Sequence, residues 1–302
     1  MKMNILITGG TGLIGKPLAQ LLKSKGHRLF LLSRSAKKVE NYDVVMKWDV
    51  KKQTIDWHTE EKINAVIHLA GAGIADERWT ESRKKIIIDS RVKSGELLKK
   101  QFAELGYEPE IVVGASAIGY YGSVTHETMM TENDKPYPDF LGETCQKWED
   151  ASESIAPSAR MVKIRIGIVL AKDGGALPKM AQAAQYYVGA PLGSGTQHLP
   201  WIHINDLCHI FEYAIQNQAL SGAYNAVAVT HCTNREFTKI LCEALHKPML
   251  PLPVPSFVIK LLFGEMATIV LNGCPVDNQK IKHAGFQFQT TDLSIAIKSL
   301  FV

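Results

Sequence analysis

A glycine-rich turn near the beginning of the chain constrains the fold more than any other feature. Residues 4–8 form a short apolar run, residues 9–15 read GGTGLIG, and leucines then recur at helical spacing at positions 18, 21 and 22. A strand, a glycine turn and a helix in this order are typical of a dinucleotide-binding unit. The alternative is a structural turn that holds no ligand, and the order of the three elements favours the binding unit.

Each glycine of the turn has a different role in such a unit. Gly9 permits the tight turn, Gly12 lets the backbone approach a pyrophosphate, and Gly15 lets the helix pack closely on the strand. The backbone amides near Leu13 and Ile14 would point at phosphate oxygens, assisted by the positive end of the helix dipole. The residues of the turn that are predicted to contact a dinucleotide are Gly9, Thr11, Gly12, Leu13, Ile14 and Gly15.

Strand-like and helical patterns alternate through the first 170 residues. Apolar runs predict further strands at residues 29–32, 44–48, 65–70, 111–115 and 162–170, and helical spacing predicts long helices near residues 81–104 and 140–155. Uninterrupted apolar runs are expected of parallel strands that are buried on both faces. The pattern predicts an α/β fold of the Rossmann type, with a doubly wound parallel sheet.

After residue 170, glycines and prolines interrupt this alternation. We expect residues 1–170 to form the dinucleotide-binding domain, with residues 203–227 returning to it. Residues 171–202 and 228–302 are expected to form a smaller C-terminal substrate lobe. Within that lobe, residues 248–255 read PMLPLPVP and cannot form a helix interior. The aliphatic run Phe257–Phe263 has helical spacing and is expected to be core, not a membrane contact.

The residues after the second predicted strand indicate which dinucleotide the turn would hold. NAD-binding domains place an Asp or Glu about 20 residues beyond the glycines, against the ribose 2′-hydroxyl. Here the sequence reads Ser33-Arg34-Ser35, followed by Lys37 and Lys38, without an acid at that place. The lysines are typical of a solvated helix start, but the Arg34 guanidinium can form two parallel hydrogen bonds with a 2′-phosphate. Ser33 and Arg34 therefore predict NADP(H) as the cofactor.

Two further strand ends offer candidate cofactor contacts. Asp49 follows the third predicted strand, where it can accept a hydrogen bond from the adenine amino group or serve as an exposed turn residue. Both interpretations stay open. Leu69, Ala70 and Gly71 end the fourth predicted strand, where small residues let the backbone run beside a cofactor.

Composition and charge argue against binding to nucleic acid, metal ions or membranes. The formal net charge is only +4 and the basic residues are dispersed, so we expect no nucleic-acid surface. Five scattered cysteines lack the spacing of a metal site or a disulfide framework. We therefore expect the thiols to be reduced and the protein to bind no metal. We find no leader-like segment and no run of about 18 apolar residues, so we expect a cytoplasmic protein without membrane association. The oligomeric state stays open.

The motifs resemble those of extended short-chain dehydrogenase/reductases: the glycine turn, VIHLAG at 66–71, and Ser116 ahead of YYG at 120–122. The chain is more closely similar to their atypical branch, named NAD-dependent epimerase/dehydratase or nucleoside-diphosphate-sugar epimerase, which carries a short C-terminal domain of unknown function. That similarity rests on motifs spread over nearly the whole chain: RWT at 78–80, SR at 90–91, GSG at 193–195 leading to WIHI at 201–204, GEM at 264–266, and AGF at 284–286.

The chemistry usual in this family uses Tyr-x-x-x-Lys on a helix, where lysine and cofactor ribose lower the tyrosine pKa for proton transfer. None of the nine tyrosines here has a lysine four residues on, and Leu141 and Cys145 stand where the pair would be expected. Ser116, at the end of the fifth predicted strand, is a candidate catalytic group or an ordinary strand-end serine. Tyr120 and Tyr121 can supply a phenol from the next loop, although tyrosines that pack a loop are commoner.

The resemblance implies further contacts with the cofactor. Arg91, on the helix after the fourth predicted strand, is expected to reach it, with a solvated helix cation as the alternative. The segment from Arg165 to Val169 is expected to pass the nicotinamide amide with its backbone, so Val169 is included among the cofactor contacts.

Candidate substrate contacts follow the glycine-rich loop at 193–195, where the family has its substrate cleft. They are Gln197, Trp201 and His203, although a lone histidine is more often structural than catalytic. Asp206 is expected to be the N-cap of a helix that begins at residue 207.

Two functions of different classes follow from these patterns. The first is an NADP(H)-dependent oxidoreductase or epimerase-like enzyme, in which the cofactor supplies a hydride. Its substrate would be a small carbonyl- or hydroxyl-bearing molecule, a class that includes nucleotide sugars. The second is an NADP(H)-binding sensor or scaffold without turnover, which the missing dyad suggests. The complete cofactor site beside a substrate lobe favours the enzyme.

Overall fold

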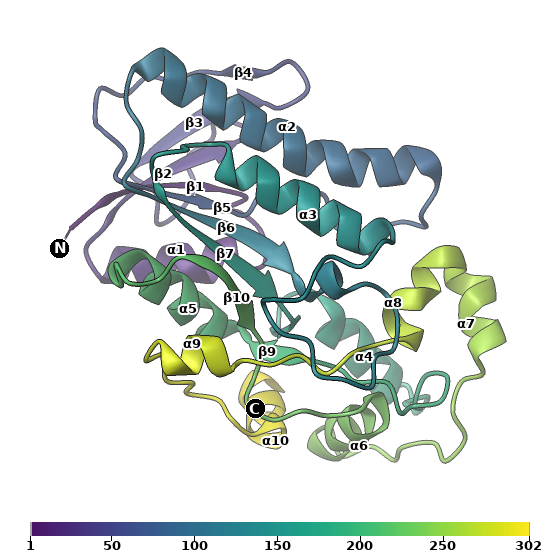
Figure 1. Cartoon of the computed structure of the whole chain (residues 1–302). Coiled ribbons are helices and arrows are strands. Elements are labelled where there is room, and N and C mark those ends of the chain that lie inside the picture. Colours follow the sequence, from purple (N-terminus) through teal and green to yellow (C-terminus); the bar gives the residue numbers. More distant parts are fainter. Residues whose placement is uncertain (1, 302) are drawn as a thin grey trace.

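An eight-stranded sheet forms the centre of the computed structural model, which describes residues 2–301 (Figure 1). The strands lie in the order β10-β7-β6-β5-β1-β2-β3-β4, and all neighbours are parallel except the pair β3 and β4. Their bounds are β1 (Asn4–Thr8), β2 (Arg28–Ser33), β3 (Val44–Asp49), β4 (Thr54–Ile55), β5 (Ala65–His68), β6 (Ile111–Ala117), β7 (Arg160–Ile166) and β10 (Gly222–Ala226). The predicted fold class, a doubly wound Rossmann-type sheet, is confirmed.

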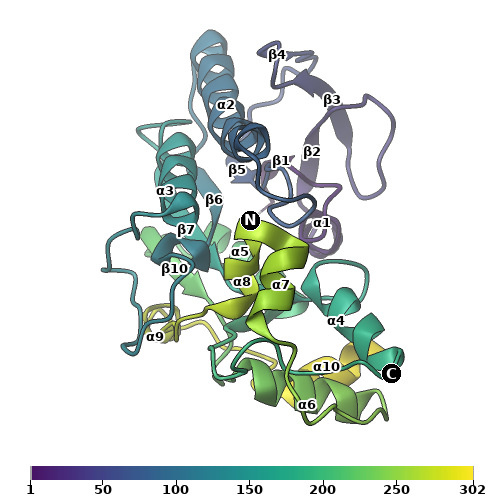
Figure 2. The same cartoon turned by 90° about the vertical axis from the view of Figure 1, so that its right-hand side faces the viewer.

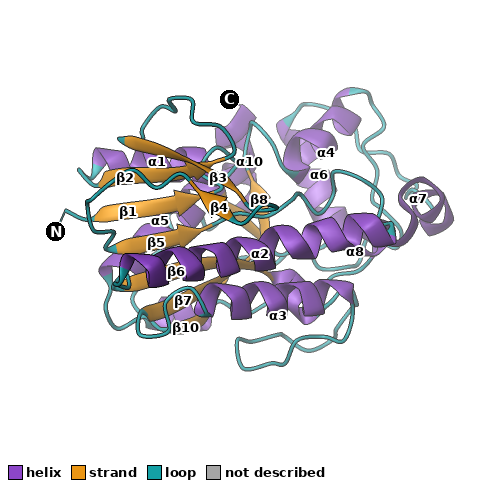
Figure 3. Cartoon of the chain, turned by 90° about the horizontal axis from the view of Figure 1, so that it is seen from above, coloured by secondary structure: helices purple, strands orange, loops and turns teal. Residues whose placement is uncertain are grey.

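Helices cover both faces of this sheet. On one face, α2 (Glu81–Leu105) packs beside α3 (Phe140–Glu153), as Figure 3 shows from above. On the other face, α1 (Gly15–Ser24) packs beside α5 (Ile204–Gln216). The Thr80 side chain caps the first turn of α2, and Asp139 caps α3 by accepting the Gly142 amide at 2.8 Å. The long helices predicted near 81–104 and 140–155 are confirmed.

The core has one layer on each side of the sheet, and β1 contributes to both. Ile5 and Ile7 pack in the layer beneath α1 and α5, whereas Leu6 packs in the layer beneath α2. All three side chains are fully buried, because successive residues of a strand point to opposite faces and helices cover both. This explains why β1 reads as a continuous apolar run.

The apolar stretch predicted as one strand at 162–170 is two strands. The break falls at Gly167, after which β8 (Ile168–Leu170) pairs with β9 (Trp201–His203) in a separate two-stranded parallel sheet. A Cβ on Gly167 would lie 2.8 Å from the Pro200 carbonyl oxygen, so this close approach requires glycine. The redirected chain reaches the C-terminal half of the molecule.

The C-terminal half consists mainly of short helices (Figure 2). They are α4 (Ala176–Gln185), α6 (Asn234–Ala244), α7 (Ser256–Phe263), the 3-10 helix η2 (Gly264–Ala267), α8 (Thr268–Leu271), α9 (Gln279–His283) and α10 (Leu293–Phe301). Leu177, Phe237 and Ile297, from α4, α6 and α10, share a separate apolar cluster. The proline-rich segment 248–255 contains no helix, as predicted.

The expectation that Phe257–Phe263 is core is wrong. This segment is α7, in which Phe257 is 72% and Leu261 75% exposed, while only Ile259 is buried. The helix packs on the 3-10 helix η2 that follows it, and Arg78 donates a hydrogen bond to the Leu261 carbonyl oxygen at 2.8 Å. None of the helices within residues 2–301 combines the length and the apolar character that crossing a bilayer requires.

Candidate functional site

Two glycines of the turn after β1 are required by the fold. Gly9 has a φ of +68°, and a Cβ there would lie 2.9 Å from the carbonyl carbon of Leu69. A Cβ on Gly15 would overlap the backbone of Gly10, because α1 starts directly against the turn. These glycines let the turn pass close to the end of β5 and let α1 begin immediately.

Gly12 differs from both, because it faces open space. A Cβ there would meet only the Gly9 carbonyl oxygen, at 3.2 Å, and Gly12 is exposed. Within residues 2–301 the backbone amides of Leu13 and Ile14 donate no backbone hydrogen bond. They lie at the N-terminus of α1, where the positive end of the helix dipole favours an anion. Free amides beside an open glycine surface fit a dinucleotide pyrophosphate.

A buried chain of hydrogen bonds fixes the strand end that faces this turn. Thr8 Oγ1 lies 2.9 Å from His68 Nδ1, and His68 Nε2 lies 3.1 Å from Ser94 Oγ. Thr8 Oγ1 also accepts the backbone amides of Leu69 and Ala70, each at 3.2 Å. Burial lowers the pKa of His68 to about 4, so the ring is neutral near pH 7. Sequence reasoning missed this group, whose signal was a polar residue at the end of each of two apolar strands.

Arg91 lies beneath the loop that follows β5. A Cβ on Gly71 would lie 3.0 Å from the guanidinium carbon, which also stacks 4.5 Å from the centre of the Trp148 ring. Nη1 donates to the carbonyl oxygens of Ala72 at 3.1 Å and Ile87 at 2.9 Å. Within residues 2–301 Arg91 forms no ion pair with a carboxylate, and burial lowers its pKa to about 10. Among the described residues, Arg91 is thus a buried cation without a counterion below the loop after β5, and such a cation is suited to an anionic ligand.

The end of β2 presents Arg34 to solvent. Its side chain is exposed and has no hydrogen bond or ion pair within residues 2–301, while the hydroxyl of Ser33 accepts the backbone amide two residues on, at 3.3 Å. Asp49 ends β3, and its Oδ1 accepts the backbone amides two and three residues on, both at 3.0 Å. Asp49 is half-buried, and both of its interpretations, a contact with adenine and a turn residue, stay predictions.

The chain beyond β8 also reaches the glycine turn. A Cβ on Gly174 or Gly175 would lie 3.1 Å from the Leu13 side chain, and one on Gly175 would lie 3.6 Å from the Val169 carbonyl oxygen. Val169 therefore lies near the glycine turn, although the two are more than 150 residues apart in sequence. Its contact with a nicotinamide stays a prediction.

Ser116 belongs to a buried polar network on β6, β7 and α3. Its hydroxyl donates to Glu149 Oε1 at 2.7 Å. Arg165, opposite Ser116 in the sheet register, holds the same carboxylate with two hydrogen bonds, Nε to Oε1 at 2.9 Å and Nη2 to Oε2 at 3.1 Å. The Arg165 and Glu149 side chains are only 4% and 3% exposed, so this ion pair depends on its complete hydrogen bonding.

Both candidate tyrosines join this network from the 3-10 helix η1 (Ile118–Tyr121). Tyr121 donates to Asn225 Oδ1 at 2.7 Å and accepts from Arg165 Nη1 at 3.1 Å. The Tyr120 ring lies 3.4 Å from the Arg165 guanidinium carbon, and its hydroxyl donates to Gln146 at 3.1 Å. Burial raises the pKa of both phenols, which keeps them protonated. Catalysis by Ser116 or either tyrosine stays a prediction.

The two dyad positions carry side chains that do not ionise near neutral pH. Leu141 and Cys145 lie one turn apart on α3, and a Cβ on Gly119 would be 3.5 Å from Leu141 and 3.6 Å from Cys145. Burial raises the pKa of the Cys145 thiol to about 12. Leu141 packs with Trp79 and Met266 in a small apolar cluster. Neither dyad position therefore carries an ionised side chain near neutral pH, and the surroundings of Leu141 are apolar.

The three candidate substrate residues lie in the interior of the C-terminal half. Gln197 Nε2 donates to the carbonyl oxygens of residues 192 and 270, at 2.9 and 2.8 Å. Trp201 is fully buried, and the His203 ring caps α5 by accepting the Asn205 amide at 3.2 Å. Their contact with a substrate stays a prediction. The expectation for Asp206 is wrong: α5 begins at residue 204, and Asp206 instead accepts two backbone amides of residues 289 and 290.

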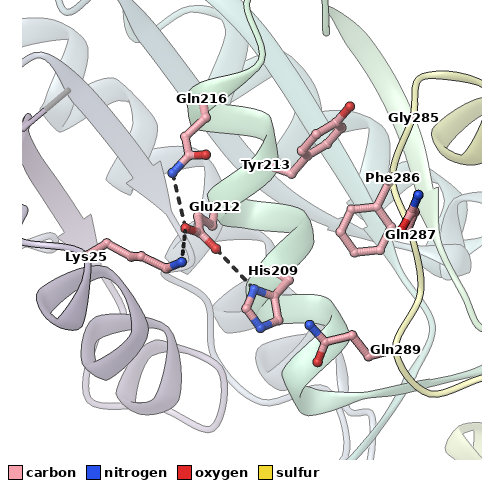
Figure 4. Close-up of a pocket in the computed structure, with 9 residues that line it drawn as sticks. All are labelled: Lys25, His209, Glu212, Tyr213, Gln216, Gly285, Phe286, Gln287 and Gln289. Atoms are coloured by element: carbon pink, nitrogen blue, oxygen red, sulfur yellow. Dashed lines mark hydrogen bonds and ion pairs between the residues drawn. The ribbon is translucent and has the colours of Figure 1, made fainter.

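A separate polar pocket of about 370 Å³ lies beside α5, at the far end of α1 from the glycine turn (Figure 4). Glu212 is at its centre and interacts with His209 and Gln216, each at 3.1 Å, and with Lys25 at 3.7 Å. The pocket is thus remote from the glycine turn. Within residues 2–301 no three His, Cys, Asp or Glu side chains are arranged to hold a metal ion, and all five cysteines are free thiols.

Comparison with known proteins shows the family. Residues 5–144 match the model of the NAD-dependent epimerase/dehydratase family, and residues 254–300 match a domain of unknown function (DUF1731). The Arabidopsis thaliana protein named epimerase family protein SDR39U1 homolog, chloroplastic, is 36% identical, and the match covers 99% of this chain and 87% of that protein. The chain belongs to the NAD-dependent epimerase/dehydratase family.

Other members of the epimerase/dehydratase family match over nearly their full length. Epimerase family protein YfhF of Bacillus subtilis is 32% identical over 99% of this chain and 98% of its own. The crystal structure of human epimerase family protein SDR39U1 with NADPH has 32% identity and a TM-score of 0.88, and the match covers 99% of both chains. The family membership inferred from the sequence motifs is confirmed.

Proposed function

We propose that this protein binds NADP(H) across the C-terminal ends of the strands, with the pyrophosphate on the glycine turn. The observation that carries the proposal is the pair of free amides, Leu13 and Ile14, at the start of α1 beside the open face of Gly12. Ala70, Gly71 and the buried Arg91 would lie along the same cofactor. The NADPH in the human relative supports this assignment.

Arg34 would select the phosphorylated form of the dinucleotide. Its exposed guanidinium has no partner within residues 2–301 and stands at the end of β2, the position that contacts the adenosine ribose in Rossmann domains. Pairing with a 2′-phosphate would use two parallel N–H groups of the guanidinium and would break no internal hydrogen bond.

We further propose that the bound cofactor serves an oxidoreductase or epimerase-like reaction on a small carbonyl- or hydroxyl-bearing substrate. Bound NADPH supplies a hydride, and this chain must position the substrate and provide a proton. Ser116 and Tyr121 are the proposed proton-transfer groups, with Tyr120 beside them. Each would have to release its present partner, Glu149 for Ser116 and Asn225 for Tyr121. We propose that residues 1–170 and 203–227 bind the cofactor, and that residues 171–202 and 228–302 bind the substrate.

A second candidate function is a binding protein that senses or responds to NADP(H) without turnover. The observation that favours it is the apolar, non-ionising pair Leu141 and Cys145 at the dyad positions, together with the complete internal bonding of Ser116 and Tyr121.

Two measurements test the proposed function. Titrations of NADPH and NADH into the protein should give the tighter binding for NADPH, and equal affinities would contradict the role given to Arg34. A screen for loss of nicotinamide absorbance with carbonyl compounds and nucleotide sugars then separates enzyme from sensor. A protein that binds NADPH tightly and is inert on the whole panel would favour the sensor.

A further inference from the structure

Arg91 is a buried cation that adjoins an open part of the surface. The residue is only 8% exposed, whereas Gly71, which its guanidinium contacts, is exposed. A Cβ on Gly71 would lie 3.0 Å from the guanidinium carbon and 3.2 Å from each terminal nitrogen, so the guanidinium lies flat against that backbone. Its carbon is also 4.5 Å from the centre of the Trp148 ring. The orientation of the group is therefore fixed by packing.

The hydrogen bonds of Arg91 leave part of the guanidinium free. Nη1 donates to the carbonyl oxygens of Ala72 and Ile87. Within residues 2–301, Nε and Nη2 donate no hydrogen bond, and no carboxylate forms an ion pair with the side chain. Burying a charge without a counterion is costly, so an anion bound at these free N–H groups would stabilise the region.

Arg91 also lies close to Cys145, the position at which the lysine of the usual dyad would be expected. The helices α2 and α3 pack side by side (Figure 3), and Trp148, which contacts Arg91, lies one turn after Cys145 on α3. Burial raises the pKa of the Cys145 thiol to about 12, and the nearby charge of Arg91 opposes this rise. A positive charge that α3 lacks at this position is thus present on α2.

A second cation near Cys145 is already paired. Arg165 also opposes the rise in the pKa of the thiol, but two hydrogen bonds hold its guanidinium to the Glu149 carboxylate. A ligand that bound Arg165 would have to compete with this buried ion pair. Arg91 has no such partner within residues 2–301, so it can bind an anion without breaking an ion pair.

We propose that Arg91 takes the place of the missing lysine and binds the ribose phosphate of the nicotinamide half of NADP(H). The inference rests on the proposed function and adds which part of the cofactor this arginine holds. Its free N–H groups would donate to phosphate and ribose oxygens, and the packing on Trp148 would keep the planar group in one orientation. Arg91 would thereby position the nicotinamide, while the proton for a reaction would come from another group.

The test compares ligands that contain or lack this half of the cofactor. The ligand 2′-phospho-ADP-ribose has the pyrophosphate and the second ribose, whereas adenosine 2′,5′-bisphosphate ends at the first phosphate. Arg91→Gln and Arg91→Met should each weaken calorimetric binding of NADP⁺ and 2′-phospho-ADP-ribose by about ten- to a hundredfold, the usual effect of losing hydrogen bonds to a charged group. Binding of adenosine 2′,5′-bisphosphate should not change.

Arg83→Gln is the matched control for an effect on the loop after β5. Arg83 is likewise a buried arginine of α2, and its Nη2 donates to the Gly73 carbonyl oxygen of that loop at 2.7 Å. Unlike Arg91 it has carboxylates nearby, from Asp76 and Glu77, each at 3.5 Å. This variant should leave the binding of all three ligands unchanged.

A rescue variant tests the place of the charge. In the Arg91→Gln protein, Cys145→Lys should recover affinity for 2′-phospho-ADP-ribose, because an ammonium on α3 would return a cation to the same position. A purely structural Arg91 would not be replaced in this way. Circular dichroism and thermal denaturation without ligand establish that each variant is folded.

The possible failures are distinguishable. If neither NADP⁺ nor NADPH binds to the wild type, the proposed function fails and this inference falls with it. If NADP⁺ binds but the Arg91 variants bind it normally, or lose adenosine 2′,5′-bisphosphate equally, Arg91 does not hold the nicotinamide half. An equal loss in Arg83→Gln, or no recovery in a folded double variant, would make Arg91 a support of the loop, and the proposed function would stand.

Discussion

The glycine turn and the network around Arg165 differ in whether their polar groups already have partners. At the turn, the amides of Leu13 and Ile14 have no backbone acceptor within residues 2–301, and Arg34 at the neighbouring strand end has no partner there either. Around Arg165, the Glu149 carboxylate binds both the guanidinium and the Ser116 hydroxyl. An exposed free donor can bind a ligand directly, whereas a buried paired group must first break an internal bond. The turn can therefore bind a ligand without breaking an internal hydrogen bond, whereas the network mainly stabilises the fold.

The sharpest test of this comparison contrasts two glycines of one turn. Gly12→Val should abolish NADPH binding, a loss of more than about a hundredfold, because the branched side chain would occupy the pyrophosphate position and displace several charge-assisted hydrogen bonds. Its unfolding transition should stay near that of the wild type, since a Cβ there meets only one carbonyl oxygen. Calorimetric titration and thermal denaturation measure the two effects.

Gly15→Val is the control with the opposite signature. Its side chain would collide with the backbone of Gly10, so the protein should lose stability whether or not cofactor is present. Normal NADPH binding by Gly12→Val would place the cofactor elsewhere and break the comparison.

The second prediction asks whether the satisfied network also serves catalysis. If a turnover activity is found, Ser116→Ala or Tyr121→Phe should slow it by about 10²–10⁴, the usual effect of removing a positioned acid, with NADPH affinity little changed. Steady-state kinetics and a cofactor titration on each variant measure this. Loss of stability by about 1–3 kcal/mol with an unchanged rate would instead make these hydroxyls structural.

The third prediction concerns the free cation at the end of β2. Arg34→Ala should weaken NADPH binding by about 1.5–3 kcal/mol and leave NADH binding unchanged, because only NADPH carries the 2′-phosphate that the guanidinium would pair with. Lys38→Ala removes the same charge four residues on and is the matched control. An equal loss in both variants would show a general effect of net charge and not a specific pair.

The smallest expected effect is on stability and comes from His68, whose two ring nitrogens are hydrogen-bonded to Thr8 and Ser94 beside the turn. His68 has a pKa of about 4 in the folded protein and 6.5 in a solvated chain, so between these values the unfolded state binds more protons. The stability contributed by the neutral ring is present above pH 6.5 and is lost as pH falls towards 4. The loss should be about 1–2 kcal/mol between pH 7 and pH 5.

Denaturant unfolding at several pH values measures this slope. His68→Gln cannot titrate and should flatten the slope relative to the wild type, while other histidines contribute equally to both proteins. An unchanged slope in the variant would mean that His68 is not the group responsible.

Much of the fold and part of the site could be predicted because their signals are local. The glycine turn, the apolar strands and the long helices depend on residues near one another in sequence, and a strand buried on both faces must read as apolar throughout. The family motifs, the absence of Tyr-x-x-x-Lys and the charge of Arg34 are likewise visible in the sequence alone.

Only the tertiary structure decided which side chains find partners. Nothing near Ser116 in sequence indicates that Glu149, 33 residues away, will accept a hydrogen bond from its hydroxyl. An apolar helix such as α7 reads the same whether it faces the core or solvent, because periodicity reports a face and not what covers it. The break at Gly167 and the chain from Thr8 through His68 to Ser94 depend on contacts between distant segments. Local sequence determined the elements and the cofactor turn, and packing between elements determined which polar groups were left free to bind.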